Sequence, residues 1–183
     1  MTPASLFLDR DGVLIKDTGY PVYPSDIEWM PGLFPALRKI RERAFRFFVL
    51  TNQSAVARGL CSFRDLVEMH AFIRTKFEDE GCPITGIYVA PTHPEGIIWP
   101  WDRASSWRKP EPGMVKQAIL DHHLEPSRVI MIGDSATDIL AARAGGVGYT
   151  ISLTEHPPPS DVAADESVAD WSALSDRILA KEW

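Results

Sequence analysis

Short apolar runs of strand length alternate along this chain with segments whose apolar residues recur at helical spacing. The clearest run is Val129–Ile132, and similar runs lie at Leu6–Leu8, Phe47–Leu50 and Ile87–Ala90. Parallel strands need a long crossover between them, and each run here is separated from the next by enough residues for a helix. The alternation therefore predicts an α/β fold with a mainly parallel sheet and helices on both faces.

The remaining elements follow from the same periodicity, and together they describe a Rossmann-like, doubly wound sheet in one domain spanning residues 1–183. Residues 10–32 and Pro91–Pro112 have no sustained period, so we expect a flap over the end of the first strand and a long functional loop. The expected helices are 33–43, one from Ser62 to near Gly81, one from Pro112, Ser135–Ala144 and 172–181; further strands are expected at Val147–Ile151 and, marginally, Val168–Ala169, with a loop at Pro157–Pro159.

Charge and composition exclude several classes of function. The net charge is −6 and no basic run stands out, which argues against binding to nucleic acid or to an anionic membrane. No apolar run approaches the length of a membrane span, and the first residues lack a signal-peptide pattern. Cys61 and Cys82 form no disulfide framework, so we expect two reduced thiols in a cytoplasmic protein. We also expect the protein to be a monomer.

Polar residues follow three of the expected core strands at the point where each strand ends. These pairs are Asp9/Asp11, Thr51/Asn52 and Asp134/Asp138. Taken singly, each pair is explained equally well by a turn or by a helix N-cap. In doubly wound sheets, however, ligands bind at the carboxyl ends of the strands. Three coincident polar strand ends therefore favour a functional site over three separate turns.

The residue types at these strand ends suit phosphoryl transfer. Crowded carboxylates favour a hard divalent cation, and Mg²⁺ prefers oxygen ligands. Asp9 beside a metal-bound phosphate could attack phosphorus and form an aspartyl-phosphate, while Asp11 could protonate the leaving oxygen and later deprotonate water. Thr51 and the Asn52 amide supply neutral donors, and Lys109 is the natural cation for the transferring group.

The chain resembles the haloacid dehalogenase superfamily of phosphohydrolases, over about residues 5–151. Within it, the chain is most similar to the branch of the D-glycero-D-manno-heptose 1,7-bisphosphate phosphatases and histidinol-phosphate phosphatases. That branch has no large cap domain, and no insertion here is long enough to form one. The segments that carry the resemblance are Leu8–Val13, Gly19–Tyr20, Leu50–Ser54, Ala57–Gly59, Arg108–Met114 and Ile132–Asp138.

The resemblance implies a role for each matching residue. Asp9 would be the nucleophile and Asp11 the general acid and base, while Thr51 and Lys109 would hold the phosphoryl group. Mg²⁺ would be bound by Asp9, the Asp11 carbonyl and Asp134, whereas Asp138 would orient Lys109 or the loop instead of binding the metal directly. The implied substrate-binding residues are Asp17, Gly19, Tyr20, Asn52, Gln53, Ser54 and Arg108.

One departure from this branch lies in the loop before Lys109. Branch members commonly carry a zinc site of Cys-x-His and Cys-x-Cys, but the four matching positions here are Ala90, Thr92, Ser105 and Trp107. His93 alone cannot make a structural zinc site, which needs four ligands, so we expect no zinc. The three tryptophans of this loop either hold it by packing or form an aromatic wall for a different substrate.

These inferences predict a Mg²⁺-dependent phosphomonoester hydrolase that acts on a small sugar phosphate, with D-glycero-D-manno-heptose 1,7-bisphosphate (as a 7-phosphatase) the best single substrate. The alternatives are histidinol phosphate, a polynucleotide 3′-phosphate, or a non-catalytic binding protein on the same scaffold. The acidic net charge weighs against the polynucleotide.

Overall fold

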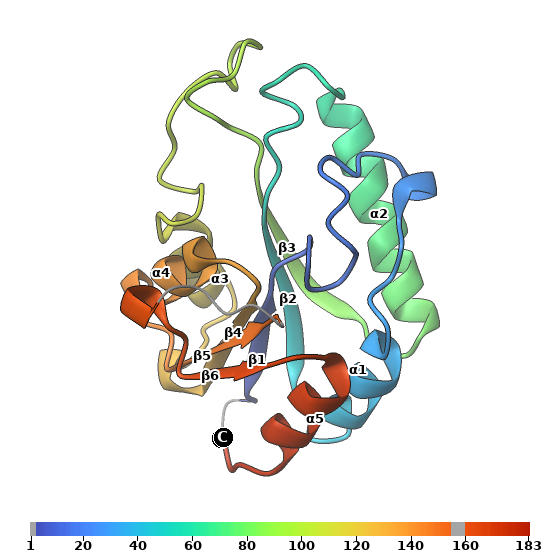
Figure 1. Cartoon of the computed structure of the whole chain (residues 1–183), viewed down its shortest axis with the longest axis vertical. Coiled ribbons are helices and arrows are strands. Elements are labelled where there is room, and N and C mark those ends of the chain that lie inside the picture. The colour runs from blue at the N-terminus through green and yellow to red at the C-terminus, as the bar shows by residue number, and fades with distance from the viewer. Residues whose placement is uncertain (1–2, 155–159) are drawn as a thin grey trace.

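A six-stranded parallel sheet forms the centre of the computed structural model, which describes residues 3–154 and 160–183 (Figure 1). The strand order is β3-β2-β1-β4-β5-β6, and every neighbouring pair is parallel. The chain therefore starts in the middle of the sheet, winds to one edge and returns to build the other half. The strands are β1 (Ser5–Leu8), β2 (Arg46–Asn52), β3 (Ile84–Ala90), β4 (Val129–Gly133), β5 (Tyr149–Leu153) and β6 (Glu166–Val168).

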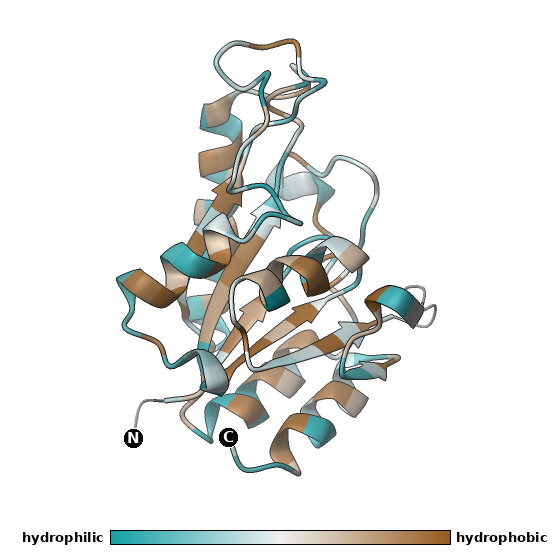
Figure 2. Cartoon of the chain, turned by 90° about the vertical axis from the view of Figure 1, so that its left-hand side faces the viewer, coloured by the Kyte–Doolittle hydropathy of each residue, from teal (hydrophilic) through white to brown (hydrophobic). Residues whose placement is uncertain are grey.

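Helices cover both faces of this sheet, as the alternation in the sequence predicts (Figure 1). One buried cluster joins the first, second and last helices to one face, and a second cluster joins the other two helices to the opposite face. The apolar strands lie between these layers (Figure 2). The helices are α1 (Leu33–Arg41), α2 (Phe63–Asp79), α3 (Gly113–Asp121), α4 (Ala136–Ala144) and α5 (Trp171–Leu179).

Most element boundaries fall close to those expected, and the fifth strand shows why one does not. Val147 was expected to begin it, but β5 begins at Tyr149. The Val147 backbone N–H instead donates to the Ala142 carbonyl oxygen at 3.0 Å, which caps the end of α4, and Gly146 has a φ of +85°. The edge strand expected at Val168–Ala169 forms two residues earlier, as β6 at Glu166–Val168, and the Pro157–Pro159 loop lies outside the described residues.

The segment 10–32 is a compact flap beside the end of β1, as expected. Ile15 forms a parallel bridge with Asp11 and an antiparallel bridge with Trp29, and a 3₁₀ turn spans Pro24–Asp26. Leu14 and Ile15 are fully buried in the core on the α1 side of the sheet. Apolar burial of this kind fixes the flap against the sheet, so its polar residues face the strand ends from a defined position.

The tryptophans of the Pro91–Pro112 loop have three different environments. Trp101 stacks on Phe63 with ring centroids 5.1 Å apart, and Trp107 lies 6.2 Å from Tyr88 in a tilted arrangement. Trp99 is 84% exposed. Packing therefore accounts for Trp101 and in part for Trp107.

No helix within the described residues is long and apolar enough to cross a membrane.

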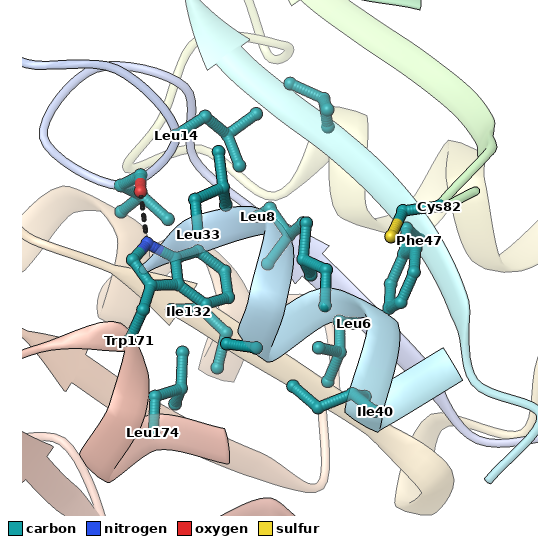
Figure 3. Packing of buried hydrophobic residues seen from close by; sticks show 14 of the residues in the cluster. Leu6, Leu8, Leu14, Leu33, Ile40, Phe47, Cys82, Ile132, Trp171 and Leu174 are labelled. Carbon is teal, nitrogen blue, oxygen red and sulfur yellow. Dashed lines mark hydrogen bonds between the residues drawn. The ribbon is translucent and has the colours of Figure 1, made fainter. Parts of the chain in front are cut away.

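Trp171 links the last helix to the loop that follows β1. Its side chain is buried between α5 and α1, and its Nε1–H donates to the Val13 carbonyl oxygen at 2.8 Å (Figure 3). Val13 lies only two residues beyond Asp11. A buried carbonyl needs this partner because it has no access to water. The C-terminal helix thus stabilises the backbone of the strand end that carries the two acids.

We expect Trp171→Phe to lower the free energy of unfolding by about 1–3 kcal/mol, because it removes a buried donor and leaves the Val13 carbonyl unpaired. Urea unfolding followed by circular dichroism measures this change. Trp99→Phe is the matched control and should stay within about 0.5 kcal/mol of the wild type, since its ring is exposed. Equal losses in the two variants would contradict the role given to Trp171.

Candidate active site

The strand order brings the three polar strand ends together. β2, β1 and β4 are neighbours, so their carboxyl ends present Thr51 and Asn52, Asp9 and Asp134 along one edge of the sheet. A cavity of about 400 Å³ opens there. It is lined by Asp9, Arg10, Asp11, Asp17, Gly19, Tyr20, Asn52, Gln53, Ser54, Lys109, Asp134, Ser135 and Thr137.

Lys109 is the buried cation at the floor of this cavity. Its Nζ lies 2.8 Å from Asp9 Oδ1 and 2.6 Å from Asp138 Oδ1, and it donates to the Leu50 carbonyl oxygen at 2.8 Å. Burial alone favours the neutral amine, but the two carboxylates outweigh it and raise the pKa of Lys109 above its usual value. Lys109 therefore stays protonated and joins residues from β1, β2 and α4.

The main chain of Lys109 is held by the Asn52 side chain. Asn52 Nδ2 donates to the Lys109 carbonyl oxygen at 2.9 Å, and the Lys109 N–H donates to Asn52 Oδ1 at 3.0 Å. This reciprocal pair uses one amide N–H and the amide oxygen of the side chain. Although Asn52 lines the cavity, the contacts recorded for it serve to position Lys109 from the end of β2.

Asp138 is fully buried, and both of its carboxylate oxygens have partners. Oδ1 contacts Lys109, and Oδ2 accepts from the Ser135 N–H at 3.1 Å and from Ser135 Oγ at 2.7 Å. These contacts close a capping box at the start of α4. Asp138 thereby contacts both Lys109 and the first turn of α4.

Asp9, Asp134 and Asp138 form the one group of potential metal ligands found among the described residues, with an oxygen from each lying within 4.8 Å of the others. Gly12 lies directly against this group, because a Cβ there would collide with the Asp134 carboxylate. Its φ of +75° also favours glycine. The backbone after Asp11 can therefore approach Asp134 closely, so a backbone carbonyl can share a cation with the carboxylates.

Crowding shifts the titration of these acids. Burial, followed by the nearby Asp138 carboxylate, raises the pKa of Asp9 well above its usual range, although Lys109 acts in the opposite direction. Burial and Asp138 likewise raise the pKa of Asp134 to about 6. Two neighbouring acids that resist ionisation are a chemical fit for a divalent cation, which would favour their charged forms.

Both oxygens of the Asp11 carboxylate accept hydrogen bonds. Arg10 donates to Oδ1 from Nε at 3.1 Å and from Nη2 at 2.9 Å, while Gln53 Nε2 donates to Oδ2 at 2.8 Å. Gln53 Nε2 also donates to Thr51 Oγ1 at 2.8 Å. Gln53, expected to bind substrate, thus also links Asp11 to Thr51.

Two of the expected site residues lie outside the cavity lining. Thr51 is fully buried behind Gln53, and Arg108 is half-buried beside the cavity with its Nη1 donating to the Thr92 carbonyl oxygen at 3.4 Å. The lining contains three residues that sequence reasoning did not single out: Arg10, between the two acids, and Ser135 and Thr137, at the start of α4. For the last two, their position directly after Asp134 was the available signal.

Arg108, next to Lys109 in the chain, lies near two other basic side chains, Arg58 and His93, and we call these three residues the rim. Arg58 Nη2 lies 3.3 Å from His93 Nε2, and the Arg58 N–H donates to the Ser54 carbonyl oxygen at 3.0 Å. Burial and the neighbouring Arg58 lower the pKa of Arg108. Among the described residues, Glu95 is the only acid within ion-pair distance of these three side chains. It lies 3.5 Å from Arg58 and is 78% exposed. The rim is therefore electropositive.

Comparison with known proteins agrees with this site. A family model described as HAD-hydrolase-like matches residues 106–173. The D-glycero-alpha-D-manno-heptose-1,7-bisphosphate 7-phosphatase of Burkholderia mallei is 35% identical over 85% of this chain and 82% of its own length. The D-glycero-beta-D-manno-heptose-1,7-bisphosphate 7-phosphatase of Escherichia coli K12 is 32% identical over 91% of this chain and 86% of its own.

A crystal structure of the D,D-heptose 1,7-bisphosphate phosphatase of B. bronchiseptica, complexed with magnesium and phosphate, has the same fold, with a TM-score of 0.83 at 23% identity. It covers 98% of this chain, which in turn covers 99% of it. The chain therefore belongs to the haloacid dehalogenase-like phosphatases, in the branch that includes the heptose bisphosphate phosphatases. It is a phosphatase on a Rossmann-like sheet.

The raised pKa of Asp134 predicts a pH-dependent stability in the absence of metal. A carboxyl whose pKa is higher in the folded than in the unfolded protein stabilises the fold at low pH, and this contribution is lost between about pH 4 and pH 6. Buried His70, with its pKa lowered to about 3, acts in the opposite direction. The test must therefore compare the wild type with a variant at each pH.

In EDTA we expect Asp134→Asn to raise the free energy of unfolding at pH 7.5 and to change it little at pH 4, because the variant cannot become charged. Added Mg²⁺ should stabilise the wild type at pH 7.5 more than the variant. Urea unfolding with and without Mg²⁺ measures both effects. A variant that is equally destabilised at both pH values in EDTA would contradict the crowding of the three acids.

Proposed function

We propose that this phosphatase transfers the phosphoryl group of a small sugar phosphate to Asp9 and then to water. The observation that carries this proposal is the placement of Asp9 against Lys109 at the floor of the cavity, with Asp11 and Asp134 beside it. Asp9, the Asp11 carbonyl and Asp134 would hold Mg²⁺. When bound, Mg²⁺ would neutralise charge on the phosphoryl oxygens and orient them.

In the first step an Asp9 oxygen attacks phosphorus and the bond from phosphorus to the sugar oxygen breaks. That oxygen keeps the bonding pair and takes a proton from Asp11. Lys109 neutralises charge on the transferring group. The Thr51 hydroxyl, which accepts from Gln53, keeps its own hydrogen for a phosphoryl oxygen.

In the second step Asp11, now a carboxylate, takes a proton from a water molecule as the water oxygen attacks phosphorus. The bond between phosphorus and the Asp9 oxygen breaks, which regenerates the Asp9 carboxylate and releases inorganic phosphate. Asp11 is left protonated and ready for the next substrate. The two acids thus divide nucleophilic and proton-transfer roles.

The preferred substrate in this proposal is D-glycero-D-manno-heptose 1,7-bisphosphate, cleaved at the 7-phosphate. The names of the relatives support it, and so does the positive charge of Arg58 and Arg108 at the rim. A second phosphate is stabilised beside such a rim, whereas the ammonium group of histidinol phosphate is repelled by it. Asp17, Gly19, Tyr20 and Ser54 line the path between rim and floor.

The remaining parts of the proposal concern context. We place the protein in the cytoplasm as a monomer, with no nucleic-acid or membrane partner, and we propose that it binds no zinc. The last point is supported by Ala90, Thr92, Ser105 and Trp107, none of which offers a thiolate or imidazole.

With Mg²⁺ present, we expect kcat/KM for the heptose bisphosphate to exceed that for histidinol phosphate by at least about tenfold, roughly the effect of one charge-assisted contact. Phosphate release measures both reactions. Arg58→Met should raise KM for the bisphosphate and leave that for a monophosphate unchanged. Arg64→Met, on the exposed face of α2, is the matched control. A preference for histidinol phosphate would overturn the proposed substrate.

A further inference from the structure

Arg10 lies between the two catalytic acids in the sequence, yet its side chain is 1% exposed. Its guanidinium turns away from Asp9 and binds one oxygen of Asp11, with Nε and Nη2 both donating to Oδ1. Nη2 also donates to the Pro21 carbonyl oxygen at 3.1 Å. Asp11 is the one acid within ion-pair distance of Arg10 among the described residues. The buried charge of Arg10 is therefore compensated by the side chain proposed to move the proton.

The two oxygens of Asp11 differ in the freedom of their partners. A guanidinium has only donors and does not lose its charge in proteins, so Arg10 cannot accept a proton from Oδ1 or exchange roles with it. The Gln53 amide on Oδ2 is a neutral donor, and its Nε2 keeps the hydrogen bond to Thr51 Oγ1 when the contact to Oδ2 is broken, so Oδ2 is held less strongly than Oδ1. The arrangement therefore distinguishes a fixed oxygen from an exchangeable one.

We propose that Arg10 is a positioning residue that fixes Asp11 Oδ1, so that Oδ2 is the oxygen that gives and takes the proton. This inference rests on the proposed function, because it assumes the acid and base roles of Asp11. Protonated Oδ2 gives its hydrogen to the sugar oxygen as the bond to phosphorus breaks. The same oxygen later removes a hydrogen from the attacking water.

Arg10 also connects Asp11 to the flap. Pro21, whose carbonyl accepts from Nη2, directly follows Tyr20, and Gly19 and Tyr20 line the cavity. The guanidinium thus bridges Asp11 and the flap. It fixes Asp11 relative to the flap residues that are proposed to contact substrate.

The test uses leaving groups that differ in their need for an acid. A sugar alkoxide must be protonated as it leaves, whereas p-nitrophenolate leaves without help. Single-turnover measurements with Mg²⁺ on the full chain follow the first step with each substrate. For Arg10→Met we expect the rate of phosphoryl transfer from the sugar phosphate to fall by about 100-fold, within the usual range for loss of acid catalysis. The rate of p-nitrophenolate release from p-nitrophenyl phosphate should change less than about threefold, because this leaving group needs no acid.

Three further variants keep the test decisive if Arg10→Met folds poorly. Arg10→Lys keeps the charge but loses the fork, so it should recover part of the sugar phosphate rate. Gln53→Leu, which frees Oδ2, should fall less than Arg10→Met. Arg10→Lys made in an Asp11→Asn background should add no further loss, because the residue through which it acts has gone.

Equal losses on both substrates for the Arg10 variants, or additive losses in the Asp11→Asn background, would overturn the positioning role. Failure of the proposed function has a different signature. In that case the wild type releases no phosphate from the sugar phosphate, or Asp11→Asn keeps the wild-type rate. Arg64→Met, a surface arginine on α2 paired with Glu68, is the matched control and should behave as the wild type in every arm.

Discussion

The site depends on one interaction, the buried contact of the Lys109 ammonium with the Asp9 and Asp138 carboxylates. A lysine that is 3% exposed is stable in its charged form only while these acids surround it. The same contact joins the strand end of β1, the start of α4 and the loop before α3. Asn52 holds the main chain of Lys109 and Ser135 holds Asp138, so further hydrogen bonds fix both sides of the contact.

The fold and the meeting of the polar strand ends were predictable from the sequence because both follow from the order of strands and helices along the chain. Apolar runs that end in Asp9, Thr51 and Asp134 meet at one edge once the strands are parallel, and β1 lies between β2 and β4. The pattern does not determine the order of the strands within the sheet. The three polar ends can form one site only if their strands are neighbours in the sheet, which is the order found. Lys109 alone would be taken for a surface lysine, and its predicted role rested on the other site residues and on the family resemblance.

The sequence alone could not predict the hydrogen bonds that form between separate segments of the chain. Nothing in the sequence places the Arg10 side chain, which is buried against Asp11 and the Pro21 carbonyl oxygen. Val147 reads as the start of a strand, but its N–H completes the end of α4. Both depend on hydrogen bonds between segments that periodicity treats separately. The rim of Arg58, His93 and Arg108 likewise forms only when the Pro91–Pro112 loop packs against the turn after Ser54.

The central claim is that Asp9 becomes covalently phosphorylated, and trapping that species tests it most directly. Enzyme mixed with substrate and Mg²⁺, quenched in acid within one turnover and treated with borohydride, converts an aspartyl-phosphate to homoserine. Mass spectrometry of the peptide containing residues 5–14 then locates it. We predict homoserine at position 9 and none at position 11. Homoserine at position 11, or its absence while phosphate is released, would contradict the account.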